Sequence, residues 1–76
     1  MDTKIIVTPS RKEQVYDYLK KAIINGELHF GSFYSVQWVA SRLGISRSPV
    51  REAVQQLQHE GLVDVFPYKG FIIKTI

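Results

Sequence analysis

A chain of 76 residues, of which 45% are hydrophobic and 22% charged, suits one small folded domain and excludes a large enzyme with a deep cleft. The absence of cysteine excludes disulfides, thiolate catalysis and cysteine-ligated zinc. Ten Lys and Arg residues against seven Asp and Glu give a formal net charge of +3, which favours a polyanionic partner. No apolar run approaches the roughly 20 residues that span a membrane, and the first ten residues are too few and too polar for a signal peptide. We therefore expect no membrane contact and a cytoplasmic protein.

The N-terminal part predicts one helix and a short extended segment. Apolar residues recur at helical spacing between residues 11 and 25, with Ser10 in front as a start signal and Gly26 behind as a stop. Residues 1–9 are expected to form an N-terminal arm. Residues 26–34, rich in glycine and aromatic residues, predict a turn that leads into a brief extended segment. The apolar side chains of this stretch are expected in the core, where they seal the first helix to the C-terminal part; they are Leu28, Phe30 and Phe33.

Two further helices follow in close succession. Ser35 is predicted to cap the second helix, which Gly44 ends because glycine adopts the left-handed conformation easily. The third helix is predicted over about 46–60, and its cap stays open between Ser46 and Ser48. Its apolar stripe consists of Val50, Ala53, Val54 and Leu57.

The C-terminal part predicts a β-hairpin. Residues 62–66 and 71–76 are rich in β-branched and aromatic residues, and the sequence PYKG at 67–70 forms a turn between them. Three helices followed by such a hairpin predict a mainly α fold with a small β-hairpin, the winged helix-turn-helix, as a single domain over residues 1–76.

The predicted third helix has a polar and basic exposed side. On a helical wheel, the positions that face away from the apolar stripe are Ser48, Arg51, Glu52, Gln55 and His59, with Arg47 beside them at the helix start. In a helix-turn-helix, the first turns of this helix enter the DNA major groove, which predicts DNA contacts from Arg47 and Arg51. The planar arginine fork can donate two hydrogen bonds to guanine or straddle phosphate oxygens. The alternative is that both arginines are solvated surface charges, or that Arg51 only pairs with a neighbouring carboxylate.

The stretch LGISRSPVREAVQQLQHEGLVDVFPYKGFIIKTI resembles the N-terminal domain of GntR-family bacterial transcription regulators, especially the branch of the fatty-acid regulator FadR. The resemblance covers roughly Val15 to Ile73. Its most specific part comprises Ser46, Arg47, Pro49, Val50, Arg51, Glu52 and Ala53, followed by Leu57, Glu60, Gly61, Leu62 and Val63.

This resemblance implies sequence-specific binding of duplex DNA by a transcription regulator, a repressor by expectation, and no enzymatic activity. The recognition helix, about 46–60, is expected in the major groove, and the wing, 66–71, near the minor groove. The residues expected to bind DNA are Ser35, Gln37, Ser46, Arg47, Ser48, Arg51, Gln55, Tyr68, Lys69 and Gly70.

The resemblance also suggests roles for individual positions. The two arginines of the third helix would read bases or adjacent phosphates, and the two serines around them would hold the DNA backbone. Gly70, expected at the wing tip, would lie at the minor groove. Gln37 stands where family members often carry an arginine that contacts phosphate. Lys69 is expected to neutralise a phosphate or enter the minor groove, against the alternative of a solvated hairpin tip, and Tyr68 either donates to a phosphate or is exposed without a role.

The partners implied by the resemblance lie partly outside this chain. By this resemblance, the full-length regulator would be a two-domain protein in which a C-terminal domain binds a small metabolite and forms the dimer. The chain stops at Ile76, where that domain would begin, so an excised DNA-binding domain is expected, the alternative being a naturally short protein. We expect a palindromic duplex operator and a homodimer in the full-length protein or on DNA. A small-molecule effector would act only through the C-terminal domain, and no cofactor is expected in this one.

Other functions have less support in the sequence. His29 and His59 stand 30 residues apart without carboxylates at ligand spacing, so neither catalysis nor a metal site is expected. The main alternative is a winged helix used as a protein-interaction module, since a fold does not fix a function. Such a module would carry an apolar or acidic face on the third helix, and SRSPVRE is neither. Trp38 either anchors another domain or a second copy, or packs within this domain.

Overall fold

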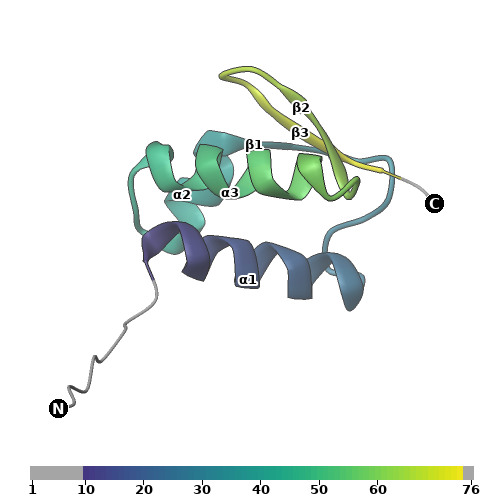
Figure 1. The fold of residues 1–76 in the computed structure, drawn as a ribbon, viewed down its shortest axis with the longest axis horizontal. Coiled ribbons are helices and arrows are strands. Elements are labelled where there is room, and N and C mark those ends of the chain that lie inside the picture. Colours follow the sequence, from purple (N-terminus) through teal and green to yellow (C-terminus); the bar gives the residue numbers. More distant parts are fainter. Residues whose placement is uncertain (1–9, 75–76) are drawn as a thin grey trace, which may run out of the picture.

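The computed structural model describes residues 10–74, so the expected arm at residues 1–9 lies outside the described part. Figure 1 shows the helices beneath and beside a small sheet, with the hairpin rising from the end of the last helix. In chain order the elements are α1 (Arg11–Ile24), β1 (Phe33–Ser35), α2 (Val36–Leu43), α3 (Arg47–His59), β2 (Val63–Phe66) and β3 (Gly70–Ile73). The predicted winged helix-turn-helix is confirmed, and each predicted helix boundary lies within a residue or two of the observed one.

The first two helices begin and end where local chemistry dictates. At α1, Ser10 Oγ accepts from the Glu13 N–H at 3.1 Å while Glu13 Oε1 accepts from the Ser10 N–H at 3.0 Å, which is a complete capping box. At α2, Ser35 Oγ accepts from the Trp38 N–H at 2.9 Å, so the predicted cap is confirmed. Gly44 ends α2 in the left-handed region, at φ 68°. The turn from α2 into α3 is therefore set by residues next to it in the chain.

The sheet has three antiparallel strands in the order β1, β3, β2. The predicted hairpin is β2 and β3, and the predicted extended segment becomes a third strand that pairs Phe33 with Ile72 and Ser35 with Gly70. This pairing brings the β1 backbone against Gly70. A Cβ atom at Gly70 would collide with the Tyr34 carbonyl oxygen and lie 2.8 Å from Ser35 Cα. Glycine at this position therefore allows β1 and β3 to lie close together.

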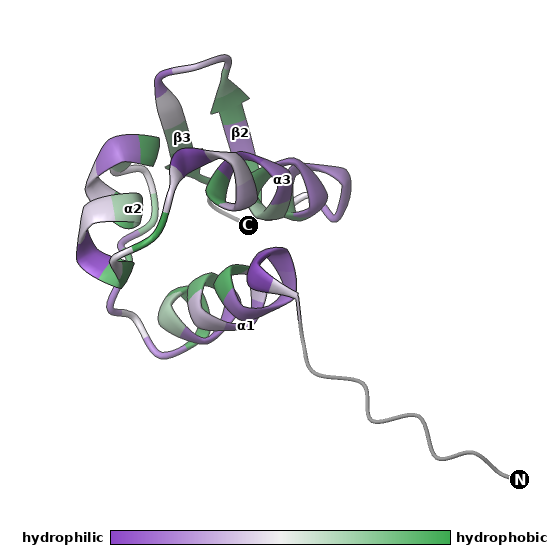
Figure 2. Ribbon diagram, turned by 90° about the vertical axis from the view of Figure 1, so that its left-hand side faces the viewer, coloured by the Kyte–Doolittle hydropathy of each residue, from purple (hydrophilic) through white to green (hydrophobic). Residues whose placement is uncertain are grey.

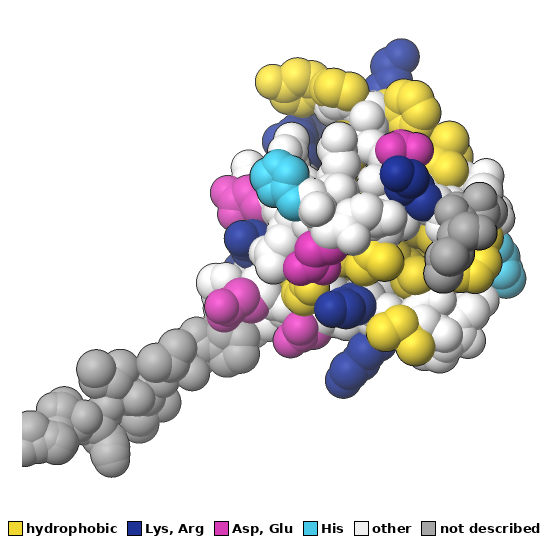
Figure 3. All heavy atoms as spheres, turned by 45° about the vertical axis from the view of Figure 1, so that its right-hand side comes forward, with side chains coloured by type: hydrophobic (Ala, Val, Ile, Leu, Met, Phe, Trp, Pro, Cys, Tyr) yellow, Lys and Arg dark blue, Asp and Glu magenta, His cyan; other side chains and the backbone are white. Residues whose placement is uncertain are grey.

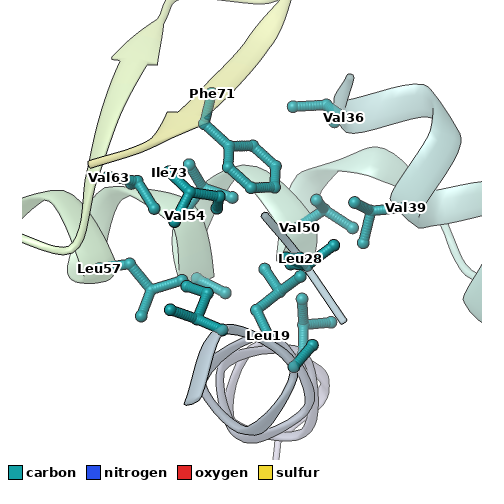
Figure 4. Close-up of a cluster of buried hydrophobic side chains, with 14 of the residues drawn as sticks. Leu19, Leu28, Val36, Val39, Val50, Val54, Leu57, Val63, Phe71 and Ile73 are labelled. Atoms are coloured by element: carbon teal, nitrogen blue, oxygen red, sulfur yellow. The ribbon is translucent and has the colours of Figure 1, made fainter. Parts of the chain in front are cut away.

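The core lies where the helices α1, α2 and α3 meet the inner face of the sheet. In Figure 4, Phe71 points from β3 toward Val50 and Val54 of α3, while Leu19 of α1 reaches the same space from below. Figure 2 shows hydrophobic and hydrophilic residues alternating along α1 and α3, as expected for helices that bury one side only. The apolar stripe of α3 is buried, whereas its polar side is exposed at Ser48, Glu52, Gln55 and His59.

One prediction about the core is wrong in part. Leu28 is buried as expected, but Phe30 is 55% exposed and Phe33 is 51% exposed. Neighbouring residues of a strand point to opposite faces, and Tyr34 takes the inner face with its ring 6.0 Å from that of Phe71. Phe33 consequently lies on the outer face, where its ring is 6.2 Å from that of Phe66.

Candidate nucleic-acid interface

The start of α3 presents donors that no acidic side chain satisfies. Ser46 is the N-cap residue, which decides between the two predicted caps, but its hydroxyl makes no capping hydrogen bond. A cap hydroxyl accepts from the N–H of the second or third helical residue, and the third is Pro49, which has none. The Ser46 hydroxyl and the first N–H groups of α3 are therefore available to an external acceptor.

Arg47 is exposed in the first turn of α3, and that turn holds no acidic residue. Within residues 10–74, the Arg47 side chain makes no hydrogen bond or ion pair. A cation at this end is unfavourable for the helix itself, because the helix dipole is positive at its N-terminus. An anion placed here would satisfy the free N–H groups, the dipole and the guanidinium together. The arrangement suits a phosphate or another electron-rich acceptor.

Arg51 lies one turn further along α3 and is half-buried against the wing. Its guanidinium carbon is 5.3 Å from the centre of the Tyr68 ring, which is a cation–π contact. Its Nε atom is buried and has no hydrogen-bond partner among the residues that the structure describes. Of the three guanidinium nitrogens only Nε is buried in this way, so the two Nη atoms remain as donors at the surface. The alternative was that Arg51 only pairs with a neighbouring carboxylate. No ion pair of Arg51 occurs in the described part of the chain.

A pocket separates α3 from the hairpin. It has a volume of about 190 Å³, and Arg51, Gln55, Pro67 and Tyr68 contribute to its lining. Gln55 is exposed on the same side of α3 as Arg51, one turn later. Three of the predicted residues, Arg51 and Gln55 of α3 and Tyr68 of the wing, thus line one pocket, although the helix and the wing are more than ten positions apart in the sequence.

The wing tip is the turn at residues 67–69, one residue shorter than predicted. Tyr68 is 83% exposed and has a positive φ of 64°, and Lys69 is exposed beside it. In Figure 3, hydrophobic side chains gather over the hairpin with a basic side chain next to them, while acidic and basic side chains mix over the helices below. The expected place of Gly70 at the tip is wrong, because Gly70 is buried against β1 at the start of β3.

The two predicted residues at the start of α2 are partly occupied within the protein. Ser35 Oγ already caps the helix, and Gln37 Nε2 donates to Ser41 Oγ at 2.9 Å. Gln37 is exposed, so its amide can still reach a partner outside the protein. Neither residue lines the pocket to which Arg51 and Tyr68 contribute.

Arg42, a basic residue of α2, contacts aromatic side chains of this domain. The Arg42 guanidinium carbon lies 5.1 Å from the centre of the Trp38 ring, and its Nε donates to the Tyr18 hydroxyl at 3.2 Å. Trp38 is 40% exposed, and its ring is also 5.4 Å from that of Tyr34. Trp38 therefore packs within this domain, although part of its ring stays accessible.

At the opposite end of α3, the charges are paired. The Tyr16 hydroxyl donates to Glu60 Oε1 at 2.6 Å and accepts from Lys20 Nζ at 3.2 Å. The hydrogen bond from Tyr16 lowers the pKa of Glu60, and the nearby Lys20 charge acts in the same direction. The hydrogen bond to Tyr16 likewise raises the pKa of Lys20. These side chains tie α1 to α3.

Two other kinds of site are absent from the described residues. No group of three or more His, Asp or Glu side chains between residues 10 and 74 could hold a metal ion. No helix in the same range is long and apolar enough to cross a membrane.

Comparison with known proteins decides the family. The model of a family described as bacterial regulatory proteins, gntR family, matches residues 11–73. This chain belongs to the GntR family. It is the DNA-binding domain of a GntR-family transcriptional regulator, and the family consists of regulators, not enzymes.

Individual GntR relatives agree in sequence and in fold. The HTH-type transcriptional regulator YdhC of Bacillus subtilis is 38% identical over 63 residues, which cover 83% of this chain and 28% of YdhC. The HTH-type transcriptional repressor RspR of Escherichia coli strain K12 is 30% identical over 76 residues, which cover 100% of this chain and 33% of RspR. The solved structure of E. coli McbR/YncC matches with a TM-score of 0.83 and 30% identity over 91% of this chain and 32% of that protein. The chain thus spans about a third or less of the length of these GntR relatives.

Proposed function

We propose that this GntR domain binds a specific duplex operator with α3 in the major groove and the wing, residues 66–71, near the minor groove. The observation that carries the proposal is the pair of arginines at the start of α3, Arg47 and Arg51, which have no carboxylate partner within residues 10–74. A helix that enters the major groove does so with its first turns, which is where both arginines lie.

Each residue of this surface has a proposed role that follows from its chemistry. Arg47 donates to guanine or to an adjacent phosphate, and Ser46 and Ser48 donate to phosphate oxygens at the helix start. Lys69, at the wing tip, neutralises a phosphate without reading sequence. Gln55 reaches a base edge or a phosphate from the following turn of α3.

A contribution from α2 is also proposed. Ser35 and Gln37 lie at the start of this helix, and the Gln37 amide is exposed. We propose that Gln37 contacts a phosphate at the edge of the site with its amide. A neutral amide replaces no counterion, so this contact adds little to the salt dependence of binding.

The rest of the regulator is proposed from its relatives. We propose that this chain belongs to the FadR-like branch and that the full-length protein carries a C-terminal domain that forms the dimer and binds a small-molecule effector. Two copies on a palindromic operator would read enough base pairs for specific regulation, which one recognition helix does not. RspR is named a repressor, and we propose repression for this regulator too, acting in the cytoplasm of a bacterial cell.

Selection from a pool of random duplexes at low salt concentration tests the proposal. The 76-residue chain should enrich one short motif, and Arg47→Ala should lose preference at one position of that motif. Lys21→Ala is the matched control, since it removes one exposed positive charge from α1 and should leave the motif unchanged. Failure of the chain to enrich any motif would contradict DNA reading and favour a protein-interaction module instead.

A further inference from the structure

At the tip of the wing, the Tyr68 side chain contacts Arg51 of the recognition helix. We propose that Tyr68 is a positioning residue. It holds the Arg51 guanidinium with its two Nη atoms toward the DNA and thereby sets the base preference of Arg51. The inference rests on the proposed DNA binding by α3 and adds a device that couples the wing to base reading.

The geometry of the contact restricts which nitrogens Arg51 can offer. The Tyr68 ring lies against the guanidinium, with 5.3 Å between the ring centre and the guanidinium carbon. The Nε atom is buried and has no acceptor among the described residues. Of the two ways in which an arginine can present a pair of donors, the one that uses Nε is therefore closed, and the pair of Nη atoms remains. A single presentation favours one hydrogen-bonding pattern in the groove, such as O6 and N7 of guanine.

The backbone of the wing tip points to a role for Tyr68 beyond folding. Tyr68 is the one non-glycine residue with a positive φ, 64°, within residues 10–74. This conformation is unfavourable for a bulky side chain and easier for glycine or asparagine. The ring is 83% exposed, so burial in the core does not offset that cost. The cation–π contact with Arg51 is what a smaller residue would lose.

The contact between Tyr68 and Arg51 depends on the folded wing, because the wing tip places the Tyr68 ring beside α3. Figure 1 shows the hairpin tip on the side of the sheet toward the first turns of α3. The tip is fixed by the Lys69 N–H, which donates to the Phe66 carbonyl at 3.0 Å, and by the Val36 N–H, which donates to the Lys69 carbonyl at 3.1 Å. A tip held at both the hairpin and α2 keeps the tyrosine ring against Arg51 before DNA arrives. Preorganisation of this kind reduces the entropy that Arg51 loses on binding.

The test compares Tyr68→Asn with Tyr68→Phe in the 76-residue chain. Asparagine tolerates the positive φ and removes the ring, so the thermal midpoint should stay within a few degrees of that of the wild type. Phenylalanine keeps the ring and loses only the hydroxyl. Relative affinities are measured by competition at low salt concentration, using the selected duplex and every single-base variant of it.

Tyr68→Asn should reduce discrimination between bases about two- to fivefold at the position read by Arg51, as expected for loss of a partly exposed cation–π contact. Tyr68→Phe should leave discrimination unchanged. In an Arg51→Ala background, Tyr68→Asn should have no further effect on discrimination, because the tyrosine acts through the arginine.

Two results would overturn the inference, and they differ from failure of the proposed function. Equal discrimination by the wild type and Tyr68→Asn would show that the ring does not position Arg51. An undiminished effect of Tyr68→Asn in the Arg51→Ala background would show that Tyr68 acts on DNA directly. A wild-type chain that prefers no duplex at all would instead overturn the proposed function, and this inference with it.

Discussion

The charged side chains at the two ends of α3 differ in whether they have partners within the protein. At the C-terminal end, Glu60 accepts from Tyr16, which in turn accepts from Lys20, so the charges of α1 and α3 satisfy one another. At the N-terminal end, Arg47 is exposed and Arg51 is half-buried against the wing, and neither has a carboxylate partner among the described residues. The first turn of α3 also holds no acidic residue to offset the helix dipole.

The presence or absence of a partner distinguishes charged side chains that stabilise the fold from those that bind a ligand. A paired charge gives up little to an incoming ligand, because its partner already satisfies it. An unpaired cation at a helix N-terminus is unfavourable until an anion arrives, so its presence there is explained by the ligand. The position of a basic residue in the sequence is thus less informative than the absence of a partner for it in the fold.

The largest effect is expected where the wing is fixed beside the binding end of α3. Gly70→Ala would place a Cβ against the Tyr34 carbonyl oxygen, a backbone atom that cannot move without disturbing the pairing of β1 with β3. We expect a loss of about 3 kcal/mol in the free energy of unfolding, near the upper end of the usual cost of overpacking. Thermal or urea unfolding measures it, and a stability equal to that of the wild type would mean that β1 does not press on the wing.

The next largest effect is expected at Arg47. Arg47→Ala should cost about 1–3 kcal/mol in binding a preferred duplex, the usual worth of a bidentate arginine–guanine pair. The free energy of unfolding should not fall, since Arg47 has no partner within residues 10–74. Arg47→Lys keeps the charge and loses the planar fork, so it should recover affinity for all sequences but not base preference. Equal losses by Arg47→Ala on every sequence would show that Arg47 contacts only phosphate.

The helices of this fold could be predicted from the sequence because their signals are local. Ser35 and Gly44 bound α2 through contacts with residues at most four positions away, so the sequence around them is sufficient. The tip contact between Arg51 and Tyr68 could not be predicted, because it depends on how β3 pairs with β1 across more than 30 residues. The same pairing decides that Phe33 lies on the outer face.

Two serines provide a matched test of the local signals. Ser35→Ala should lower the free energy of unfolding by about 1 kcal/mol, because Ser35 Oγ accepts from the Trp38 N–H. Ser46→Ala should leave stability unchanged, since Ser46 makes no capping hydrogen bond. It should instead weaken binding to all duplexes alike, through loss of a phosphate contact. Chemical denaturation and duplex titration of both variants check the pair, and a loss of stability in Ser46→Ala would contradict the free hydroxyl.

The smallest effect is expected at the paired end of α3. The Tyr16 hydroxyl lowers the pKa of Glu60 in the folded state, so the stabilisation is present above the ordinary value of 4.5 and is lost as the pH falls through the lowered value. Glu60→Gln should therefore be less stable than the wild type at neutral pH, and the difference should shrink as the pH falls below 4.5. Thermal midpoints from neutral pH down to the acid range measure it. A difference that does not change with pH would contradict a pairing through the Glu60 carboxylate.

The most direct test of the central claim is the salt dependence of binding to one duplex. If the unpaired cations of α3 and the wing bind DNA, the affinity of the chain should fall steeply and linearly on a log–log plot against salt concentration, because phosphate contacts release counterions. Lys69→Ala should reduce the slope by about 0.9, the value for one phosphate contact on B-form DNA. Lys21→Ala on α1 should leave the slope unchanged. An affinity that does not change with salt concentration would contradict the assignment of this surface to DNA.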